Sequence, residues 1–283
     1  MDNTKKCGKQ GELKMYNGKK VGLSITTLNR PDYFKQCIDH IIKNTRSIDY
    51  IVVVNDGSKK EHRKAYEEIY KTLPKEIKVI DQEKNGGCSK AKNTLLKEMI
   101  AKGCSHLFIC EDDILVLDDR AITEYIRIAV EYDFHNICYA LHGPINIGKR
   151  LPIPGEVAYY PDSVGAFCYY SKEALEKSKN EDGTFLDEHF HNAMEHVELT
   201  DRIAREGMTL SFSMFVDISD SDKYLSEIEG SIDNSSIRPK SKSAQAEKKF
   251  RANILDALEY WAKKDGHRFP LWDLLFSYRR NFG

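Results

Sequence analysis

Short, continuously apolar segments alternate with helix-like segments through the first half of this 283-residue chain. Four of them predict strands: VGLSITTL from Val21, DYIVVVND from Asp49, EIKVID from Glu76 and SHLFICEDDILV from Ser105. Between them, apolar residues recur at the helical period, most clearly after Pro31. Strands of this kind that alternate with helices are typical of a mostly parallel sheet covered on both faces. The sequence therefore predicts an α/β fold.

Acidic residues follow two of these strands where each strand ends. Asp56 ends the second strand at a Gly57-Ser58 turn, and Glu111-Asp112-Asp113 follows the apolar part of the fourth. Such sheets bind ligands beyond the carboxyl ends of their strands. Three adjacent carboxylates also repel one another unless a cation compensates them. We expect both acidic groups to face one crevice; the simpler alternatives are a helix cap at Asp56 and a solvated acidic turn.

The second half of the chain is less regular. It contains a Pro- and Gly-rich stretch over 148–161, the segments DSVGAFCYYSKEAL and MEHVELTDRIAREG, and the strand candidate TLSFSMFVDI. A polar, Ser- and Lys-rich stretch near the end predicts an exposed linker. We divide the chain into a polar N-terminal segment (1–20), one α/β domain (21–232), a linker (233–249) and a C-terminal helical and aromatic extension (250–283).

Composition excludes several classes of function. The formal net charge of -1 gives no overall field that would favour nucleic acid or a membrane surface. No apolar run is long enough to span a bilayer, and the N-terminal segment lacks the apolar core of a signal peptide. Seven cysteines without C-x-x-C spacing argue against a disulfide framework or a zinc knuckle. We expect a soluble, cytoplasmic protein in which Cys37, Cys88 and Cys138 are small core residues.

The order of the motifs resembles glycosyltransferase family 2, whose members share the GT-A fold, a Rossmann-like α/β fold. The resemblance covers roughly residues 20 to 220. Downstream, residues 165–175 resemble the segment that lies under the acceptor, and residues 195–207 resemble the acidic catalytic helix. The motifs that carry the resemblance in the first half are Thr26 to Pro31, Asn55-Asp56-Gly57-Ser58, Asn85-Gly86-Gly87 with Lys92-Asn93, and Glu111-Asp112-Asp113.

The resemblance implies a nucleoside-diphosphate sugar as donor, most simply a UDP-sugar, with Mn²⁺ or Mg²⁺ as cofactor. In the family the position of Asp56 contacts the uracil, although Asn55 here replaces the usual first aspartate. The last carboxylate of the family's D-x-D motif binds the metal ion, and an earlier one holds the ribose. Carried over, Asp113 is the metal ligand, Asp112 the sugar contact and Glu111 a reserve ligand.

Two further positions complete the donor site that the resemblance implies. Thr26 lies at the end of the first strand, within the nucleotide-binding motif. Lys92 stands where the family places a basic residue near the diphosphate, and a solvated lysine on a helix face is the alternative.

Glu195-His196-Val197-Glu198 resembles the E-D motif of the family, whose aspartate removes the proton from the acceptor hydroxyl. His196 stands where that aspartate is expected, so the base is His196, Glu195 or Glu198. On a helix Glu198 can pair with Arg202, which favours a structural role for Glu198. Glu195 and His196 therefore stay as the catalytic candidates, and an exposed, salt-bridged helix is the structural alternative.

Many relatives supply another metal ligand after the last core strand, often a histidine. No histidine stands there in this chain, and Asp217 is our substitute, although an Asp/Ser turn is the simpler interpretation. The aspartates between 217 and 222 lack the Gly and closing Glu of a calcium loop. The histidines between 189 and 196 miss the spacing of an H-E-x-x-H zinc motif.

The sequence thus predicts a metal-assisted glycosyltransferase, and the resemblance alone implies that it inverts the anomeric configuration. One alternative is a nucleotidyltransferase of the same fold neighbourhood, but the glycine-rich basic loop typical of those enzymes is missing from TTLNRPDY. A second is a non-catalytic module that binds a nucleotide-sugar or glycan. His196 in place of the catalytic aspartate favours this non-catalytic alternative, and the intact Asp112-Asp113 pair argues against it.

The acceptor is left open among a glycan, a protein, a small molecule and a modified nucleic-acid base. No stable membrane span is expected. The C-terminal extension shapes the acceptor site, forms a homodimer, packs on the core or docks to a membrane surface through Trp261, Trp272, Arg279 and Arg280. Its aromatic character favours dimerisation or packing on the core.

Overall fold

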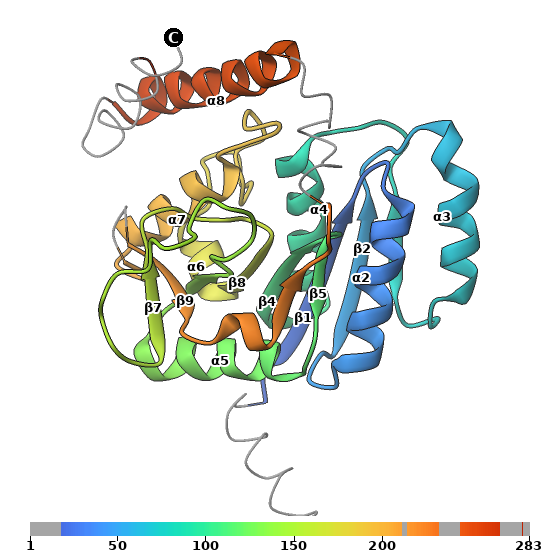
Figure 1. The fold of residues 1–283 in the computed structure, drawn as a ribbon, viewed down its shortest axis with the longest axis horizontal. Coiled ribbons are helices and arrows are strands. Elements are labelled where there is room, and N and C mark those ends of the chain that lie inside the picture. Colours follow the sequence, from blue (N-terminus) through green and yellow to red (C-terminus); the bar gives the residue numbers. More distant parts are fainter. Residues whose placement is uncertain (1–17, 211–213, 232–243, 267–278, 280–283) are drawn as a thin grey trace, which may run out of the picture.

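A computed structural model describes residues 18–210, 214–231, 244–266 and 279 of the chain. Its centre is a six-stranded sheet with the order β3-β2-β1-β4-β8-β6 (Figure 1). Strands β1 to β4 are parallel, whereas β8 runs antiparallel to both β4 and β6. The bounds are β1 (Lys20–Thr27), β2 (Tyr50–Asn55), β3 (Lys78–Asp81), β4 (Cys104–Glu111), β6 (Asn136–Cys138) and β8 (Phe167–Ser171). The predicted α/β fold with a mostly parallel sheet is confirmed.

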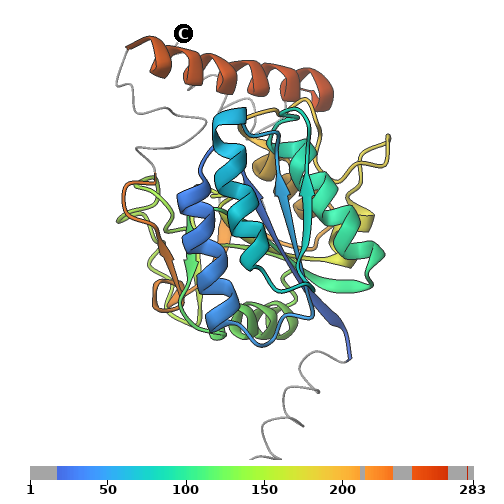
Figure 2. The ribbon, with the colours of Figure 1, turned by 90° about the vertical axis from the view of Figure 1, so that its right-hand side faces the viewer.

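Helices pack on both faces of this sheet (Figure 2). One face is covered by α2 (Pro31–Asn44), α3 (Lys60–Thr72) and α5 (Arg120–Tyr132), and the other by α4 (Cys88–Ala101), α6 (Lys172–Lys177) and α7 (Glu195–Arg205). Successive side chains of a strand alternate between the two faces, so Val53 joins the first core and Val52 the second. Because both faces are buried, the strands appear in the sequence as unbroken apolar runs.

Two small antiparallel ribbons extend from the main sheet. β5 (Ile114–Val116) pairs with β10 (Leu225–Glu227), β7 (Val157–Tyr160) pairs with β9 (Phe215–Ile218), and a short 3₁₀ helix, η1, covers Ser221–Lys223. The single strand predicted from Ser105 is therefore two strands. β4 ends at Glu111 and β5 begins at Ile114, because β5 leaves the main sheet to pair with β10. Asp112 and Asp113 form the turn between them.

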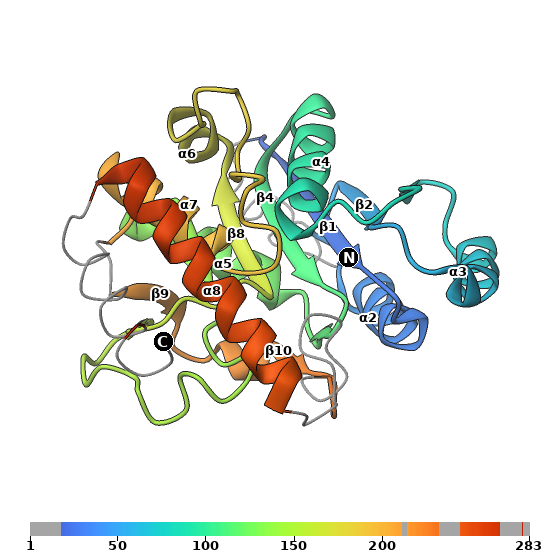
Figure 3. The ribbon, with the colours of Figure 1, turned by 90° about the horizontal axis from the view of Figure 1, so that it is seen from above.

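Helix α8 (Ala244–Asp265) lies across the edge of the molecule where the parallel strands have their carboxyl ends (Figure 3). The helix begins inside the segment predicted as linker, of which residues 233–243 lie outside the described part. Trp261 is fully buried against the core, so this residue does not fit the membrane docking that is one of the alternatives for the extension. Arg279 pairs with Glu259 at 2.7 Å, and Trp272 and Arg280 are outside the described residues.

No described helix combines the length and the apolar character that crossing a bilayer requires.

Candidate active site

A cavity of about 580 Å³ opens at the carboxyl edge of the parallel strands, between the ends of β1, β2 and β4 and the start of α7. Its volume falls within the range of roughly 300–1,000 Å³ that is usual for small-molecule sites. Parallel strands end at the same edge of a sheet, so the side chains that follow them converge there. Six of the residues predicted for donor, metal and catalysis line it: Thr26, Asp56, Asp112, Asp113, Glu195 and His196. Lys92, Asp217 and Glu198 do not.

Arg30 holds the acidic pair together at the end of β4. Its guanidinium pairs with Asp112 and, at 3.1 Å, with Oδ2 of Asp113. The hydroxyl of Thr27 donates to the other oxygen of Asp112 at 2.6 Å. Burial raises the pKa of Asp112 to about 7, although the charge of Arg30 opposes the shift. One guanidinium cannot fully compensate two buried carboxylates, so a further positive charge at this place would be favourable.

One oxygen of Asp113 and one nitrogen of the neighbouring His142 lack a hydrogen-bond partner among the described residues. Asp113 Oδ1 and His142 Nε2 are both buried, face each other at 3.6 Å and have no hydrogen-bond partner among the described residues. The distance is too long for a hydrogen bond, and buried polar atoms are rarely left unpaired. Glu227 Oε1 lies 3.9 Å from the same imidazole nitrogen. A carboxylate oxygen and an imidazole nitrogen are both common metal ligands, so these residues fit a divalent cation.

His142 was not among the predicted site residues. It lies in the loop after β6, where the sequence offers only a His-Gly pair behind an apolar strand as a signal. Asp217 on β9 holds this loop in place, because Asp217 Oδ2 accepts a hydrogen bond from the backbone N of Ala140 at 3.0 Å and Oδ1 accepts one from Tyr125 at 2.7 Å. Asp217 is fully buried and does not line the cavity. Its prediction as a metal ligand is therefore wrong, and it acts on the loop that carries His142.

Lys92 lies beneath the cavity surface and ties β4 to α7. Its Nζ is 2.8 Å from Glu195 Oε1 and 3.0 Å from Glu111 Oε1, and its side chain is 1% exposed. This position fits neither the predicted diphosphate contact nor a solvated lysine. Burial by itself would raise the pKa of Glu195, but Lys92 and His196 hold that pKa well below its usual range. Glu195 is therefore a carboxylate at neutral pH.

The same ammonium explains a cluster that would otherwise suggest a second metal site. Ligand atoms of Cys88, Glu111 and Glu195 lie within 4.8 Å of one another. Lys92 pairs with two of the three, so its charge already occupies the place that a cation would take.

His196 lies in the first turn of α7, beside Glu195, and lines the cavity. Its Nδ1 is 3.4 Å from Glu195 Oε1, and its Nε2 is 3.3 Å from the backbone oxygen of Ser163. Gly165 leaves room for the ring, since a Cβ there would lie 2.7 Å from Nδ1. Burial by itself would lower the pKa of His196, but the charge of Glu195 more than offsets burial, so the pKa of His196 lies above its usual value. The carboxylate thus orients the imidazole and increases its basicity.

Glu198 points away from the cavity. It is fully buried, and Arg202 Nε donates to its Oε1 at 2.7 Å, so the predicted pairing with Arg202 is confirmed. Of the three base candidates from the sequence, only Glu195 and His196 lie at the cavity.

Asp56 shapes the glycine loop that precedes α4. Its Oδ1 accepts a hydrogen bond from the backbone N of Gly86 at 2.8 Å and its Oδ2 one from that of Gly87 at 3.0 Å. Gly87 has a φ of 90° and packs against His191, and a Cβ would lie 2.2 Å from that imidazole. Only glycine suits such a position. Asp56 borders the cavity with both oxygens engaged, and its contact with a nucleobase stays a prediction.

Transfer of a group from a nucleoside diphosphate requires charge compensation at the phosphates and a base across the crevice from them. Asp113 and His142 fit a cation, and Glu195 and His196 form a carboxylate–imidazole pair that lines the same cavity. A mostly parallel α/β sheet with a cavity of this kind at its carboxyl edge is the arrangement expected of the GT-A fold.

Comparison with known proteins identifies the family of this chain. The chain belongs to glycosyl transferase family 2, whose model matches residues 23–203. It is 29% identical over 107 residues to the uncharacterized glycosyltransferase R363 of Acanthamoeba polyphaga mimivirus, an alignment that covers 35% of this chain and 40% of that protein. The chain thus spans less than half the length of this relative.

Solved structures resemble the chain in fold. The mannosyltransferase PcManGT from Pyrobaculum calidifontis, in complex with GDP-Man and Mn²⁺, superposes with a TM-score of 0.59 at 15% identity, over 92% of this chain and 68% of that one. S. aureus TarS 1-349, in complex with UDP-GlcNAc, gives a TM-score of 0.50 at 17% identity, over 84% and 67%. At these identities the likeness concerns the fold.

Proposed function

We propose that this protein transfers a sugar from a nucleoside-diphosphate sugar, in the first instance a UDP-sugar, to an acceptor hydroxyl, with Mn²⁺ or Mg²⁺ and with inversion of the anomeric carbon. Membership of glycosyl transferase family 2 supports sugar transfer and disfavours the nucleotidyltransferase alternative. The fold neighbours crystallised with GDP-Man and Mn²⁺ or with UDP-GlcNAc support a nucleotide-sugar donor.

The donor would lie along the acidic side of the cavity. Asp56 and Thr26 border the end of β2 and β1, where the nucleoside is expected, and Asp112 lies between them and the metal position. Asp113 and His142 would hold the cation, because their facing atoms make no hydrogen bond among the described residues. When bound, a divalent cation supplies positive charge to the diphosphate as it leaves. Arg30 offers a second positive group at the same place.

The acceptor hydroxyl would attack the anomeric carbon from the side of α7. A new bond forms between the acceptor oxygen and that carbon as the bond from the carbon to the diphosphate oxygen breaks. We assign the proton of the hydroxyl to the imidazole of His196, and the neighbouring Glu195 stabilises the imidazolium that results. Lys92 keeps Glu195 charged, since it pairs with the same carboxylate oxygen. In-line attack of this kind predicts inversion, which the anomeric configuration of the product would report.

The pair of unsatisfied atoms at Asp113 and His142 carries this proposal, and thermal shift tests it. UDP with Mn²⁺ at about 100 times its Kd should stabilise the protein by about 2.7 kcal/mol. The stabilisation should disappear in Asp113→Ala and His142→Ala. Asp162→Asn is the matched control, because Asp162 also lines the cavity but pairs with Lys149 at 3.2 Å. Equal shifts in all four proteins would refute the metal position.

We also propose a cytoplasmic location. All six cysteines in the described part of the chain are free thiols, which suits a reducing compartment. The predicted homodimer through the C-terminal extension stays a prediction; within the described residues α8 packs on its own chain through Trp261.

A further inference from the structure

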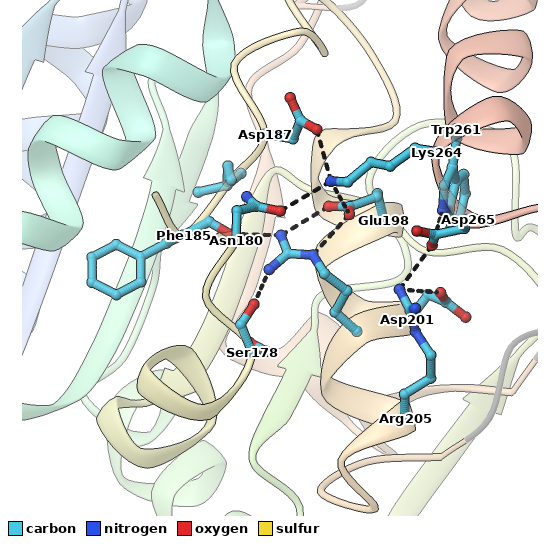
Figure 4. A network of polar contacts seen from close by, with 12 residues as sticks. Ser178, Asn180, Phe185, Asp187, Glu198, Asp201, Arg205, Trp261, Lys264 and Asp265 are labelled. Carbon is cyan, nitrogen blue, oxygen red and sulfur yellow. Dashed lines mark hydrogen bonds and ion pairs between the residues drawn. The ribbon is translucent and has the colours of Figure 1, made fainter. Parts of the chain in front are cut away.

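A network of polar contacts holds helix α8 near its C-terminal end. Near its C-terminal end, Lys264 Nζ contacts Asp187 Oδ2 at 2.8 Å, Asn180 Oδ1 at 3.0 Å and Glu198 Oε1 at 3.4 Å (Figure 4). Asp265 pairs with Arg205 of α7 at 2.9 Å in the same network (Figure 4). The fully buried Trp261 lies beside these polar groups. These contacts hold the C-terminal end of the helix on α7.

The earlier turns of α8 border the cavity instead. Phe250 and Ile254 line it from this helix, and they belong to one apolar cluster with Met194, Val197 and Phe215, which also line it. We call these five residues the apolar wall. None of them carries a side-chain donor that could bind a phosphate, and the thioether sulfur of Met194 is only a weak acceptor for a hydroxyl. A donor bound along the acidic side of the cavity therefore does not account for the apolar wall.

The apolar wall adjoins the candidate base. Met194 directly precedes Glu195, and Val197 directly follows His196, so the wall begins on both sides of the carboxylate–imidazole pair. A hydroxyl that gives its proton to His196 must place the atoms attached to it near these side chains. Burial of hydrocarbon against such a surface is favourable, whereas burial of unpaired hydroxyl groups is costly.

From this placement we propose that the acceptor is amphiphilic: its reacting hydroxyl lies at His196, and a hydrocarbon group next to it packs on the apolar wall beneath α8. The inference rests on the proposed transfer reaction and adds the chemical class of its acceptor. It makes Phe250 and Ile254 determinants of acceptor specificity that take no part in donor binding.

A homologous series of ligands tests the proposal. Methyl, butyl and hexyl β-glucosides, each below its micelle concentration, are titrated by calorimetry into the full chain with and without UDP and Mn²⁺. Binding should tighten by about two- to fourfold per added methylene, the upper value corresponding to full burial. The tightening should be lost in Phe250→Ala and in Phe250→Gln, whereas the stabilisation by UDP and Mn²⁺ should not change in either variant. Lys248→Ala is the matched control, because Lys248 is an exposed residue of the same helix.

The outcomes separate this inference from the proposed function. A parent protein that binds all three glucosides equally, or Phe250 variants that keep the parent's dependence on chain length, would overturn the amphiphilic acceptor. Dependence on chain length without any binding of UDP and Mn²⁺ would support the apolar wall and overturn the donor assignment.

Discussion

Replacement of Lys92 by methionine removes the positive charge from an enclosed ion pair and keeps the apolar stem. Glu195, only 3% exposed, then loses the ammonium that lies 2.8 Å from its carboxylate. Loss of one partner from a buried pair costs about 3–5 kcal/mol. The side chain of Glu111 is 27% exposed, so water compensates its share, and we expect a loss of about 3–4 kcal/mol. At roughly 2–4 °C per kcal/mol this lowers the Tm by about 6–16 °C.

The loss should depend on pH, and its sign follows from the pKa of Glu195. In the parent that pKa is depressed, so the carboxylate contributes stability that is present above its unfolded pKa of about 4.3 and is lost as pH falls through the folded pKa. In the variant, burial without Lys92 raises the pKa, so the carboxyl group takes up a proton as pH falls. The difference in unfolding free energy between the two proteins should therefore be largest near neutral pH and shrink towards pH 4.

Urea unfolding, followed by tryptophan fluorescence between pH 4.5 and pH 8, measures this difference. In the double variant Lys92→Met/Glu195→Gln the buried position 195 no longer carries an unpaired charge, so part of the lost stability should return. Lys90→Met is the matched control, because Lys90 is exposed on the same helix and its replacement should change stability by less than about 0.5 kcal/mol. A loss in Lys92→Met below about 1 kcal/mol, or one that is equal at both ends of the pH range, would refute the reasoning.

Three further predictions concern the cavity. In Glu195→Gln the pKa of His196 should fall, because the charge that raises it is gone; the acidic limb of the kcat/KM profile should move to lower pH, and an unmoved limb would argue against His196 as the base. Gly165→Ala places a Cβ 2.7 Å from His196 Nδ1 and should lower kcat while UDP binding is kept; unchanged kcat would contradict the assigned ring position. Asp217→Ala leaves the Tyr125 hydroxyl and the Ala140 amide without their acceptor, so we expect the free energy of unfolding to fall by about 2–5 kcal/mol. Mn²⁺ binding, measured by electron paramagnetic resonance, should also weaken. An unaltered Mn²⁺ affinity would show that Asp217 does not position the His142 loop.

The sheet and the edge that carries the cavity could be predicted from the sequence because they depend on local pattern. Apolar runs buried on both faces identify parallel strands, and strand ends identify the edge where Asp56 and Asp113 meet. The residues quoted for the family resemblance lie at that edge for the same reason.

The remaining parts of the site depend on contacts between distant segments. His142 reaches Asp113 from a loop that Asp217, far away in the sequence, helps to hold, and no local signal marks that arrangement. Lys92 has the exposed-helix pattern of a solvated lysine, yet α7 covers it and supplies Glu195 as its partner. The placement of α8 over the cavity likewise follows from Lys264 and its partners rather than from its own sequence period.

The ribbon of β5 and β10 affects the order in which parts of this protein fold during synthesis. The backbone N of Ile228 donates to the carbonyl oxygen of Asp113 at 2.8 Å, and Glu227 accepts from the backbone N of Gly143 at 3.0 Å. Strands β1 to β4 all lie before residue 112, so the ribosome has completed them well before it reaches β10. The turn that bears Asp113 acquires its last hydrogen bond only after residue 228 has left the exit tunnel. A nascent chain arrested before that point should hold the sheet but fail to retain manganese.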